Sequence, residues 1–200
     1  MARRTDHSRD ELIDLVLNHS QQIIEQKGVA ALTARSIAAA IGYSPGTLYN
    51  LFNNIDEIIL HLNGRTLADL HRSIAKAIQG RSGRAQLDHL ISAYLDFSKT
   101  AETRWALLTQ HHPPRDEPLP DWYQEQVEQL LEQLASILRL LLPGCGNTEI
   151  KHSAGVLWCG LNGISTNAGQ NKLPGMSPSS LDEMARSLAY NYISGLKRVA

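Results

Sequence analysis

Cysteine, aromatic side chains and long apolar runs are all scarce in this chain. Its 200 residues include two Cys, and aromatic residues make up 6% of them. Cys145 and Cys159 lack metal-like spacing, and a chain of this size needs no disulfide staple, so we expect reduced, structural thiols. No apolar run approaches the roughly 20 residues that span a bilayer, and Met1–Asp14 carries charges where a signal peptide is apolar. We expect a cytoplasmic protein with no membrane partner.

A surplus of positive charge is also lacking. The formal net charge is −1, and residues 1–64 contain five Lys or Arg against seven Asp or Glu. Affinity for duplex DNA rests largely on neutralising phosphates with Lys and Arg. A DNA-binding function would therefore have to rest on the geometry of the fold more than on bulk charge.

Helical periodicity is what the chain has in abundance. Hydrophobic residues make up 42% of the sequence and recur at three- and four-residue steps, with no long period-two alternation. These features predict an all-α fold of about nine helices, divided near Leu62 into domains of residues 1–62 and 63–200. The expected helices cover residues 8–28, 33–40, a short stretch from 45, a long one of about 25 residues from 54, 87–112 with a kink or break near 100–103, 122–142, 148–170 and 178–197.

Local signals mark the ends of the first helices. Ser8 with Glu11 three places on predicts a capping box, and Gly28 ends that helix. Ser44-Pro45 is typical of an N-cap followed by proline at the first helical position. Asn54 and Glu57 repeat the capping-box pattern at the start of the long helix.

Two short helices separated by a tight turn lie between Thr33 and Phe52, which is the spacing of a helix-turn-helix. Ala38 is small where the helices must approach, and Gly42 can adopt the left-handed backbone of the turn. Ser44 and Gly46 leave the start of the second helix uncrowded, so that backbone amides can meet phosphate while side chains reach bases. The shared core is expected to contain Ile37, Ile41 and Leu48.

The residues of this stretch resemble the DNA-binding signature of TetR regulators, over residues 8–62. The resemblance rests on Thr33, Ser36-Ile37-Ala38, Ile41-Gly42, Ser44, Gly46-Thr47-Leu48-Tyr49, Phe52 and Glu57-Ile58. Because several unrelated residue types fall in the right order, the signal is far more specific than a lone glycine motif. The resemblance implies an all-helical homodimer that binds double-stranded operator DNA. The alternative is a structural helix hairpin inside a bundle.

The resemblance also names the residues that would meet DNA. They are Arg3, Arg4, Thr33, Arg35, Ser44, Pro45, Gly46, Thr47, Tyr49, Asn50 and Asn54. Arg3 and Arg4 resemble the basic arm that many members lay on the duplex. Thr33 is interpreted as an N-cap, a phosphate donor or both. Leu51 stands where a histidine is common and Ile55 where a lysine usually meets a phosphate, which predicts weaker electrostatic attraction.

The last two helices are predicted to form the homodimer surface that the resemblance implies. One stripe of the last helix contains Leu181, Met184, Leu188, Tyr192 and Leu196, widened by Ala185, Ala189 and Ile193. Small residues of the preceding helix, Gly155, Cys159 and Gly163, would let another helix come close. The alternative is a large monomeric core.

An aromatic stripe in the second domain suggests a pocket for an unknown small-molecule effector, provided that one helix runs on through Thr103. The candidate ligand-binding residues are Tyr94, Phe97, Trp105, Leu108, His112, Trp122, Trp158 and Asn162. Plain core is the alternative for each. His111 and His112 point about 100° apart on a helix, so we expect no metal site there, and no cofactor.

Three functions remain open from the sequence. The leading hypothesis is a repressor that binds a near-palindromic operator as a dimer and is released by the effector. A helical-bundle carrier or enzyme would need a nucleophile–base pair or a metal cluster, and neither is visible, so we expect no enzymatic activity. A third hypothesis keeps DNA binding but makes the protein an activator or a regulator without a ligand.

Overall fold

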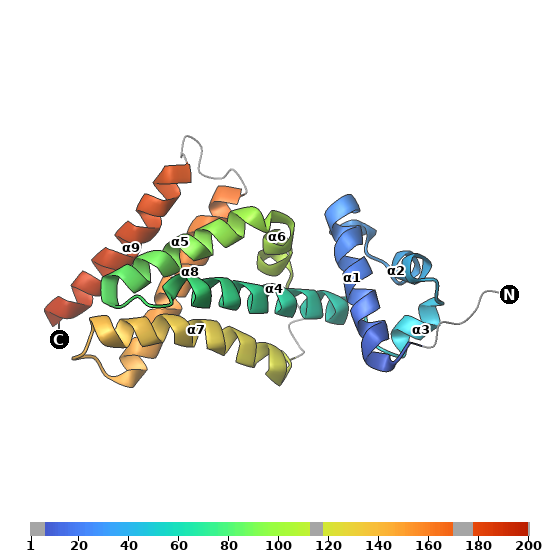
Figure 1. The fold of residues 1–200 in the computed structure, drawn as a ribbon, viewed down its shortest axis with the longest axis horizontal. Coiled ribbons are helices and arrows are strands. Elements are labelled where there is room, and N and C mark those ends of the chain that lie inside the picture. The colour runs from blue at the N-terminus through green and yellow to red at the C-terminus, as the bar shows by residue number, and fades with distance from the viewer. Residues whose placement is uncertain (1–6, 113–117, 170–177, 200) are drawn as a thin grey trace. The chain divides into compact units, whose positions relative to one another are not determined.

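The structure is a computed structural model that describes residues 7–112, 118–169 and 178–199, and over these ranges it is entirely helical (Figure 1). The prediction of an all-α fold of about nine helices is confirmed. One short 3₁₀ helix, Val29–Ala31, accompanies the α-helices. Their bounds are α1 Arg9–Lys27, α2 Ala34–Ile41, α3 Pro45–Tyr49, α4 Ile55–Ile78, α5 Gly83–Thr100, α6 Glu102–Gln110, α7 Asp121–Leu141, α8 Asn147–Gly169 and α9 Pro178–Val199.

The chain divides into two compact units, and the division falls inside α4 between Arg65 and Thr66. Unit 1 contains α1 to α3 and the first part of α4, together with His111 and His112, which follow α6. Unit 2 contains the rest of α4 and helices α5 to α9. In the described ranges, no helix is long and apolar enough to cross a membrane.

The ends of α1 follow directly from local hydrogen bonding. The Oγ of Ser8 accepts from the Glu11 N–H at 3.3 Å, and the Glu11 carboxylate accepts from the Ser8 N–H at 2.8 Å. At the other end, Gly28 has a positive φ of 79°, and its N–H donates to the carbonyl of Ile24. The capping box and the glycine stop are therefore both confirmed. Within unit 1, α1 packs against α2, and α2 against α3.

The start of α4 differs in one detail from the capping box expected there. The side-chain oxygen of Asn54 accepts from the Glu57 N–H at 2.8 Å, as predicted. The Glu57 carboxylate, however, accepts from the N–H of Asn53 at 2.6 Å, one residue earlier than expected. Two backbone N–H groups at the helix start, those of Asn53 and Glu57, are still satisfied, and the Glu57 carboxylate bonds Asn53 in place of Asn54.

The helical stretch expected over residues 87–112 is broken near residues 100–103, as predicted, so the condition set for the aromatic stripe, one helix that runs on through Thr103, is not met. Helix α5 ends at Thr100 and α6 begins at Glu102. Ala101 lies between them with φ −107° and ψ 37°, outside the helical region. The aromatic stripe is consequently divided between two helices with separate axes.

Helices α5, α7, α8 and α9 pack against one another to form the core of unit 2. Its side chains are almost fully buried, and they include Leu70, Ile74, Leu87, Ile91, Tyr94, Leu130, Leu134, Ile137 and Leu138. Each buried side chain of this size contributes about 1.5–3 kcal/mol relative to an exposed one, and this burial is the main source of stability in the unit.

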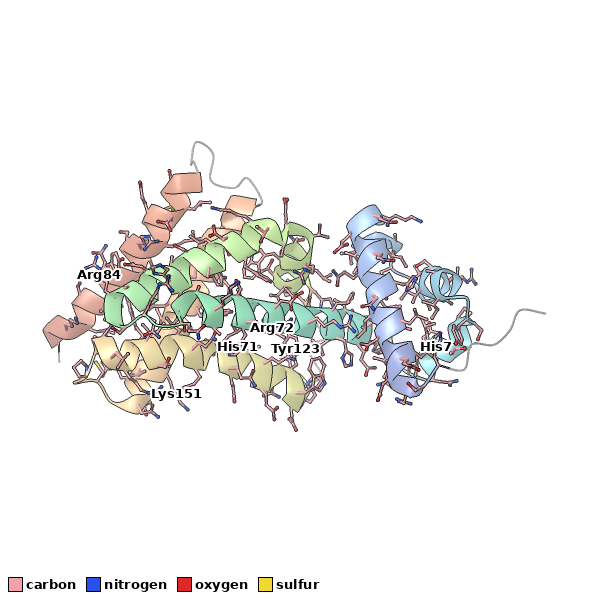
Figure 2. All side chains as sticks on the ribbon, viewed as in Figure 1. His7, His71, Arg72, Arg84, Tyr123 and Lys151 are labelled. Carbon is pink, nitrogen blue, oxygen red and sulfur yellow. The ribbon has the colours of Figure 1, made fainter. Side chains whose placement is uncertain are left out.

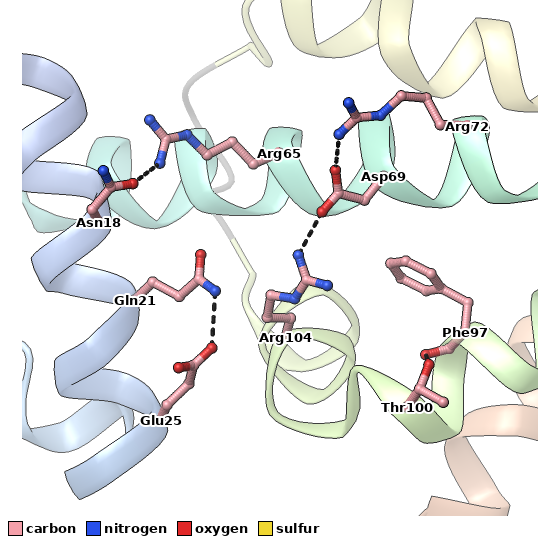
Figure 3. A network of polar contacts seen from close by, with 9 residues as sticks. All are labelled: Asn18, Gln21, Glu25, Arg65, Asp69, Arg72, Phe97, Thr100 and Arg104. Carbon is pink, nitrogen blue, oxygen red and sulfur yellow. Dashed lines mark hydrogen bonds and ion pairs between the residues drawn. The ribbon is translucent and has the colours of Figure 1, made fainter. Parts of the chain in front are cut away.

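An ion network joins α4 to α6 within unit 2 (Figure 3). The Asp69 carboxylate accepts from Arg104 at 2.7 Å and also from Arg72. Burial alone would raise the pKa of Asp69, but the hydrogen bonds and charges of Arg104 and Arg72 outweigh it and hold this pKa below its usual range. The carboxylate is therefore more strongly stabilised as an anion in the folded chain than in the unfolded one.

The replacement Asp69→Asn should lower the free energy of unfolding by about 1 kcal/mol at neutral pH, or ~2–4 °C in Tm. Because the folded-state pKa is lowered, the contribution of Asp69 is complete above about pH 3.9, the ordinary pKa of Asp, and disappears as pH falls through the lowered value. Thermal unfolding of both proteins over a pH series measures this convergence. Asp96→Asn, at an exposed position of α5, is the control. A difference in Tm that stays constant into strong acid would contradict the assignment.

Candidate functional site

The turn between α2 and α3 depends on Gly42. Helix α2 begins at Thr33, whose Oγ1 accepts from the Ser36 N–H at 3.1 Å. It ends at Gly42, which adopts the left-handed conformation with φ 76° and ψ 26°. In that geometry the N–H groups of Gly42 and Tyr43 both reach the carbonyl of Ala38. A residue with a Cβ would be strained at this φ, so the role predicted for Gly42 is confirmed.

Helix α3 starts as its sequence predicts. Ser44 is the N-cap, with its Oγ accepting from the Thr47 N–H at 3.3 Å, and Pro45 occupies the first helical position. Leu48 and Phe52 turn inward and are almost fully buried, as are Ile37 and Ala38 of α2. The apolar contacts beneath therefore fix the orientation of the short helix, and its opposite side stays exposed.

The predicted DNA-binding residues that the structure describes are at the surface or partly exposed. Those classed as exposed are Thr33, Arg35, Ser44, Pro45, Gly46, Tyr49 and Asn50, whereas Thr47 and Asn54 are half-buried. The side chain of Tyr49 is 58% exposed. Arg3 and Arg4 lie outside the described residues.

These residues fall into two groups, those whose side chains already cap a helix and those whose side chains have no hydrogen bond to another described residue. The side chains of Thr33, Ser44, Thr47 and Asn54 all take part in helix-capping contacts. A hydroxyl or amide held in this way can still meet a phosphate, but its position serves the local fold first. Arg35, Tyr49 and Asn50 make no side-chain hydrogen bond to another described residue, and they are therefore available to an outside partner.

The acidic residues of unit 1 lie outside the helix-turn-helix in the sequence, although the Glu57 carboxylate bonds the N–H of Asn53 just after it. Residues 26–55 contain no Asp or Glu at all, which an overall charge count does not reveal. Several carboxylates outside this stretch are engaged within the unit. Asp14 pairs with Arg65 at 2.5 Å, Asp56 with His111 at 3.0 Å, and Glu25 accepts from Gln21 at 2.9 Å. The local charge of the exposed helices is thus slightly positive despite the acidic total.

In unit 2, the predicted aromatic residues gather around Tyr94. Its ring meets Trp105 and Trp158 edge-on, with centroids 5.2 and 5.4 Å apart, and Phe97 lies 6.3 Å from Trp105. The Tyr94 hydroxyl donates to the Oδ1 of Asn162 at 2.7 Å. Burial raises the pKa of Tyr94, so the hydroxyl remains a proton donor at any physiological pH.

A pocket of about 460 Å³ adjoins this cluster; we call it the α8 pocket. It is lined by Leu67, Leu108, Thr109, Tyr123, Val127, Trp158, Asn162, Gly163, Thr166 and Asn167. Of the predicted ligand residues, Leu108, Trp158 and Asn162 line it, whereas Tyr94, Phe97 and Trp105 belong to the buried cluster and are not among its lining residues. Trp122 packs on Tyr123 outside the lining, and His112 belongs to unit 1.

The sequence analysis missed Tyr123, and a signal for it exists. On α7 the buried positions include Tyr123, Leu130, Leu134 and Ile137, which recur at helical spacing. Trp122 lies about 100° away from that face. Following the apolar stripe of α7 back to its start would have selected Tyr123 over the larger aromatic neighbour.

The α8 and α9 helices approach closely at Gly160. A Cβ at this position would lie 2.3 Å from the Cδ2 of Leu188. Ala185, Ala189 and Ile193 are buried, whereas the predicted stripe Leu181, Met184, Leu188, Tyr192 and Leu196 is only half-buried. Val156 and Cys159 are exposed on α8, and both cysteines are free, so Cys159 is not a core residue.

Within the described ranges, no three His, Cys, Asp or Glu side chains come together as they would around a metal ion. The Nε2 of His111 bonds the Asp56 carboxylate of unit 1 at 3.0 Å. The arrangement of unit 1 suits recognition by an exposed helix, and that of unit 2 suits binding of a small molecule.

Comparison with known proteins relates the helix-turn-helix to one family. Residues 16–62 match the family described as bacterial regulatory proteins, tetR family. An uncharacterized HTH-type transcriptional regulator, YobS of Bacillus subtilis (strain 168), is 26% identical over 84 residues, which are 42% of this chain and 44% of YobS. The match thus spans less than half the length of that relative.

Solved structures share the whole fold. A protein of unknown function from Rhodococcus sp. RHA1 aligns with a TM-score of 0.73 and 20% identity, over 98% of this chain and 99% of its own. FadR of Thermus thermophilus, a TetR family transcriptional repressor in complex with lauroyl-CoA, aligns with a TM-score of 0.68 and 18% identity, over 89% and 93%. Residues 16–62 are thus similar to the helix-turn-helix of the tetR family of bacterial regulatory proteins, and the whole chain shares the fold of the solved structures.

Proposed function

We propose that the protein is a repressor that binds a near-palindromic operator as a homodimer and leaves it when a small molecule occupies the α8 pocket. The observation that carries this proposal is the exposed face of α3, fixed from below by Leu48 and Phe52 and free of acidic residues. Tyr49 on this face is 58% exposed and makes no side-chain hydrogen bond to another described residue, so its ring and hydroxyl are accessible to DNA.

The proposed DNA contacts fall into two groups. Side chains of α3 and its end would enter the major groove, and these are Pro45, Thr47, Tyr49 and Asn50. The start of α2, the start of α3 and the start of α4 would meet phosphates through Thr33, Arg35, Ser44 and Asn54, with Arg3 and Arg4 as a basic arm. Gly46 lets the backbone approach the duplex closely.

The small number of cations makes pairing of two subunits important. Arg35 is the one Lys or Arg between residues 33 and 55. A single helix-turn-helix with so little charge would bind duplex weakly. Two such elements, held one helical turn of about 34 Å apart, would read two half-sites at once and multiply the affinity. The exposed apolar side chains of α8 and the half-buried stripe of α9 suit the contact between subunits.

The effector role of the α8 pocket draws support from two sides. Its volume lies in the usual range for ligand sites, and it combines aromatic walls with a few polar groups. FadR of Thermus thermophilus, which shares the fold, is itself described as a repressor in complex with a small molecule.

Purified protein should prefer the DNA around its own gene over random duplex of equal length, with a shallow dependence on salt because few phosphates are neutralised. Fluorescence anisotropy with labelled duplexes at several salt concentrations measures both properties. Equal affinity for the two duplexes at moderate salt would overturn the proposed function.

The replacement Gly46→Ala should separate DNA binding from folding. An added methyl group would meet only the Ser44 Oγ at 3.7 Å, and a helix tolerates Ala better than Gly by about 0.5–1 kcal/mol, so stability should not fall. Operator affinity should fall about tenfold if the backbone lies against the duplex, as one lost contact of ~1.4 kcal/mol would cause. Gly144→Ala, at another open position, is the control. Unchanged operator affinity would show that α3 does not approach DNA at this residue.

The replacement Val156→Arg should produce monomers, since a charge on the exposed face of α8 would be buried without a partner between subunits. Operator affinity should fall at least about 100-fold, because only one half-site is then held. Leu140→Arg adds the same charge at a more exposed apolar position of α7 and should stay dimeric. Analytical ultracentrifugation and anisotropy measure the two effects. A Val156→Arg dimer, or a monomer that binds as well as the wild type, would refute this surface as the operator-binding dimer interface.

A further inference from the structure

Among the residues that the structure describes, the lining of the α8 pocket contains no charged side chain. One wall is α8, with Trp158, Asn162, Gly163, Thr166 and Asn167, and the other walls come from α4, α6 and α7. All ten lining residues are neutral, and none is a histidine. An ion at this partly open site gives up part of its hydration and gains no opposite charge from the lining, so the site favours neutral molecules over ions.

Charged side chains on the helices around the α8 pocket are engaged in ion pairs or line a separate groove. Asp69 of α4 is held by Arg104 and Arg72. The α7 carboxylates Glu125, Glu128 and Glu132 line a separate groove with Lys151 of α8. Tyr123, which lines the α8 pocket, and Lys151 lie apart within unit 2 (Figure 2). Charge is thus segregated from the pocket in the described part of the chain.

The polar groups of the pocket include a fixed hydrogen-bond donor. The Tyr94 hydroxyl donates to the Oδ1 of Asn162, and this bond fixes which way the amide is turned. The NH₂ group of the amide takes no part in the bond. This NH₂ donates to no other described residue. The Asn167 amide, in contrast, is occupied by the carbonyl of Gly163 at 2.7 Å. Asn162 therefore presents a donor to whatever fills the pocket.

The aromatic side of the pocket is rigid. Trp158 is braced by the edge of Tyr94, which is in turn packed against Trp105. Tyr123 adds a second ring from α7, and burial raises the pKa of its hydroxyl, so it also stays neutral. Flat apolar molecules gain dispersion and edge-to-face contacts from rings that are already fixed in place.

We infer that the α8 pocket selects an uncharged, mainly apolar, ring-containing molecule whose hydrogen-bond acceptor meets the amide NH₂ of Asn162. The inference rests on the proposed function for the pocket's role as an effector site, and it specifies the class of effector. It distinguishes this chain from a regulator of acyl-CoA esters, whose phosphates and long flexible chain match neither the neutral lining nor the aromatic walls.

Matched probes test the selection on the full-length wild-type protein. Acetonaphthone, naphthoate and isopropylnaphthalene, all substituted at the same ring position, share one shape but carry a neutral acceptor, an anion and no acceptor respectively. Isothermal titration calorimetry and the shift in Tm measure their binding at neutral pH, with lauroyl-CoA as a fourth probe. The ketone should bind about tenfold or more tightly than naphthoate, and about 3- to 10-fold more tightly than the hydrocarbon.

A pair of variants tests the donor. Asn162→Asp replaces it by an anionic acceptor and should weaken the ketone about tenfold or more. Asn147→Asp makes the same chemical change at the exposed start of α8, where Arg139 already contacts it, and should leave the ketone's affinity unchanged.

Several outcomes would overturn the inference. They are tighter binding of naphthoate or lauroyl-CoA than of the ketone, equal binding of ketone and hydrocarbon, and no binding of any probe. Fluorescence anisotropy with operator DNA distinguishes failure of this inference from failure of the proposed function. Selective binding of the ketone that leaves the affinity for operator DNA unchanged would contradict release by the effector but uphold the ligand class. If the protein shows no preference for operator DNA but still selects the ketone, the proposed DNA-binding function is contradicted and the ligand class is upheld.

Discussion

The rest of the structure depends on α4 being one uninterrupted helix. It begins at the Asn54 cap in unit 1 and ends at Ile78 in unit 2, so the same ladder of backbone hydrogen bonds runs through both. Side chains secure it in each unit. Arg65 bonds Asp14 and Asn18 of α1, and Asp69 bonds Arg104 of α6.

Local chemistry explains why much of the fold was predictable. Caps and stops such as Ser8, Gly42 and Ser44-Pro45 act through hydrogen bonds to residues three or four places away, so the sequence beside them contains the whole signal. A break near residues 100–103 was predicted, but no local signal marks Ala101 as its position, because alanine favours helix. It is a tertiary effect, with α6 turned so that Trp105 packs on Tyr94 and Arg104 reaches Asp69.

The two candidate sites also differ in how far the sequence predicts them. The helix-turn-helix could be identified from the sequence because its turn, caps and core lie within twenty residues. The pocket could not be delimited, because its walls come from four helices and its membership depends on how each one is rotated. Trp158 and Asn162 were predicted, whereas Tyr123 and Thr109 were not, and His112 proved to belong to unit 1. A charge count leaves out a related point, namely which carboxylates, such as Asp14 and Asp56, already have partners.

Helix α8 faces in two directions. Trp158 and Asn162 line the pocket, while Val156 and Cys159 on the same helix are exposed to the outside. Because one rigid element carries both sets, any partner that docks on the outer side changes the free energy of ligand binding by the same amount by which the ligand changes docking. If that partner is a second copy of this chain, as proposed above, and docking is coupled to ligand binding, the affinity measured for a small molecule depends on protein concentration wherever association is incomplete.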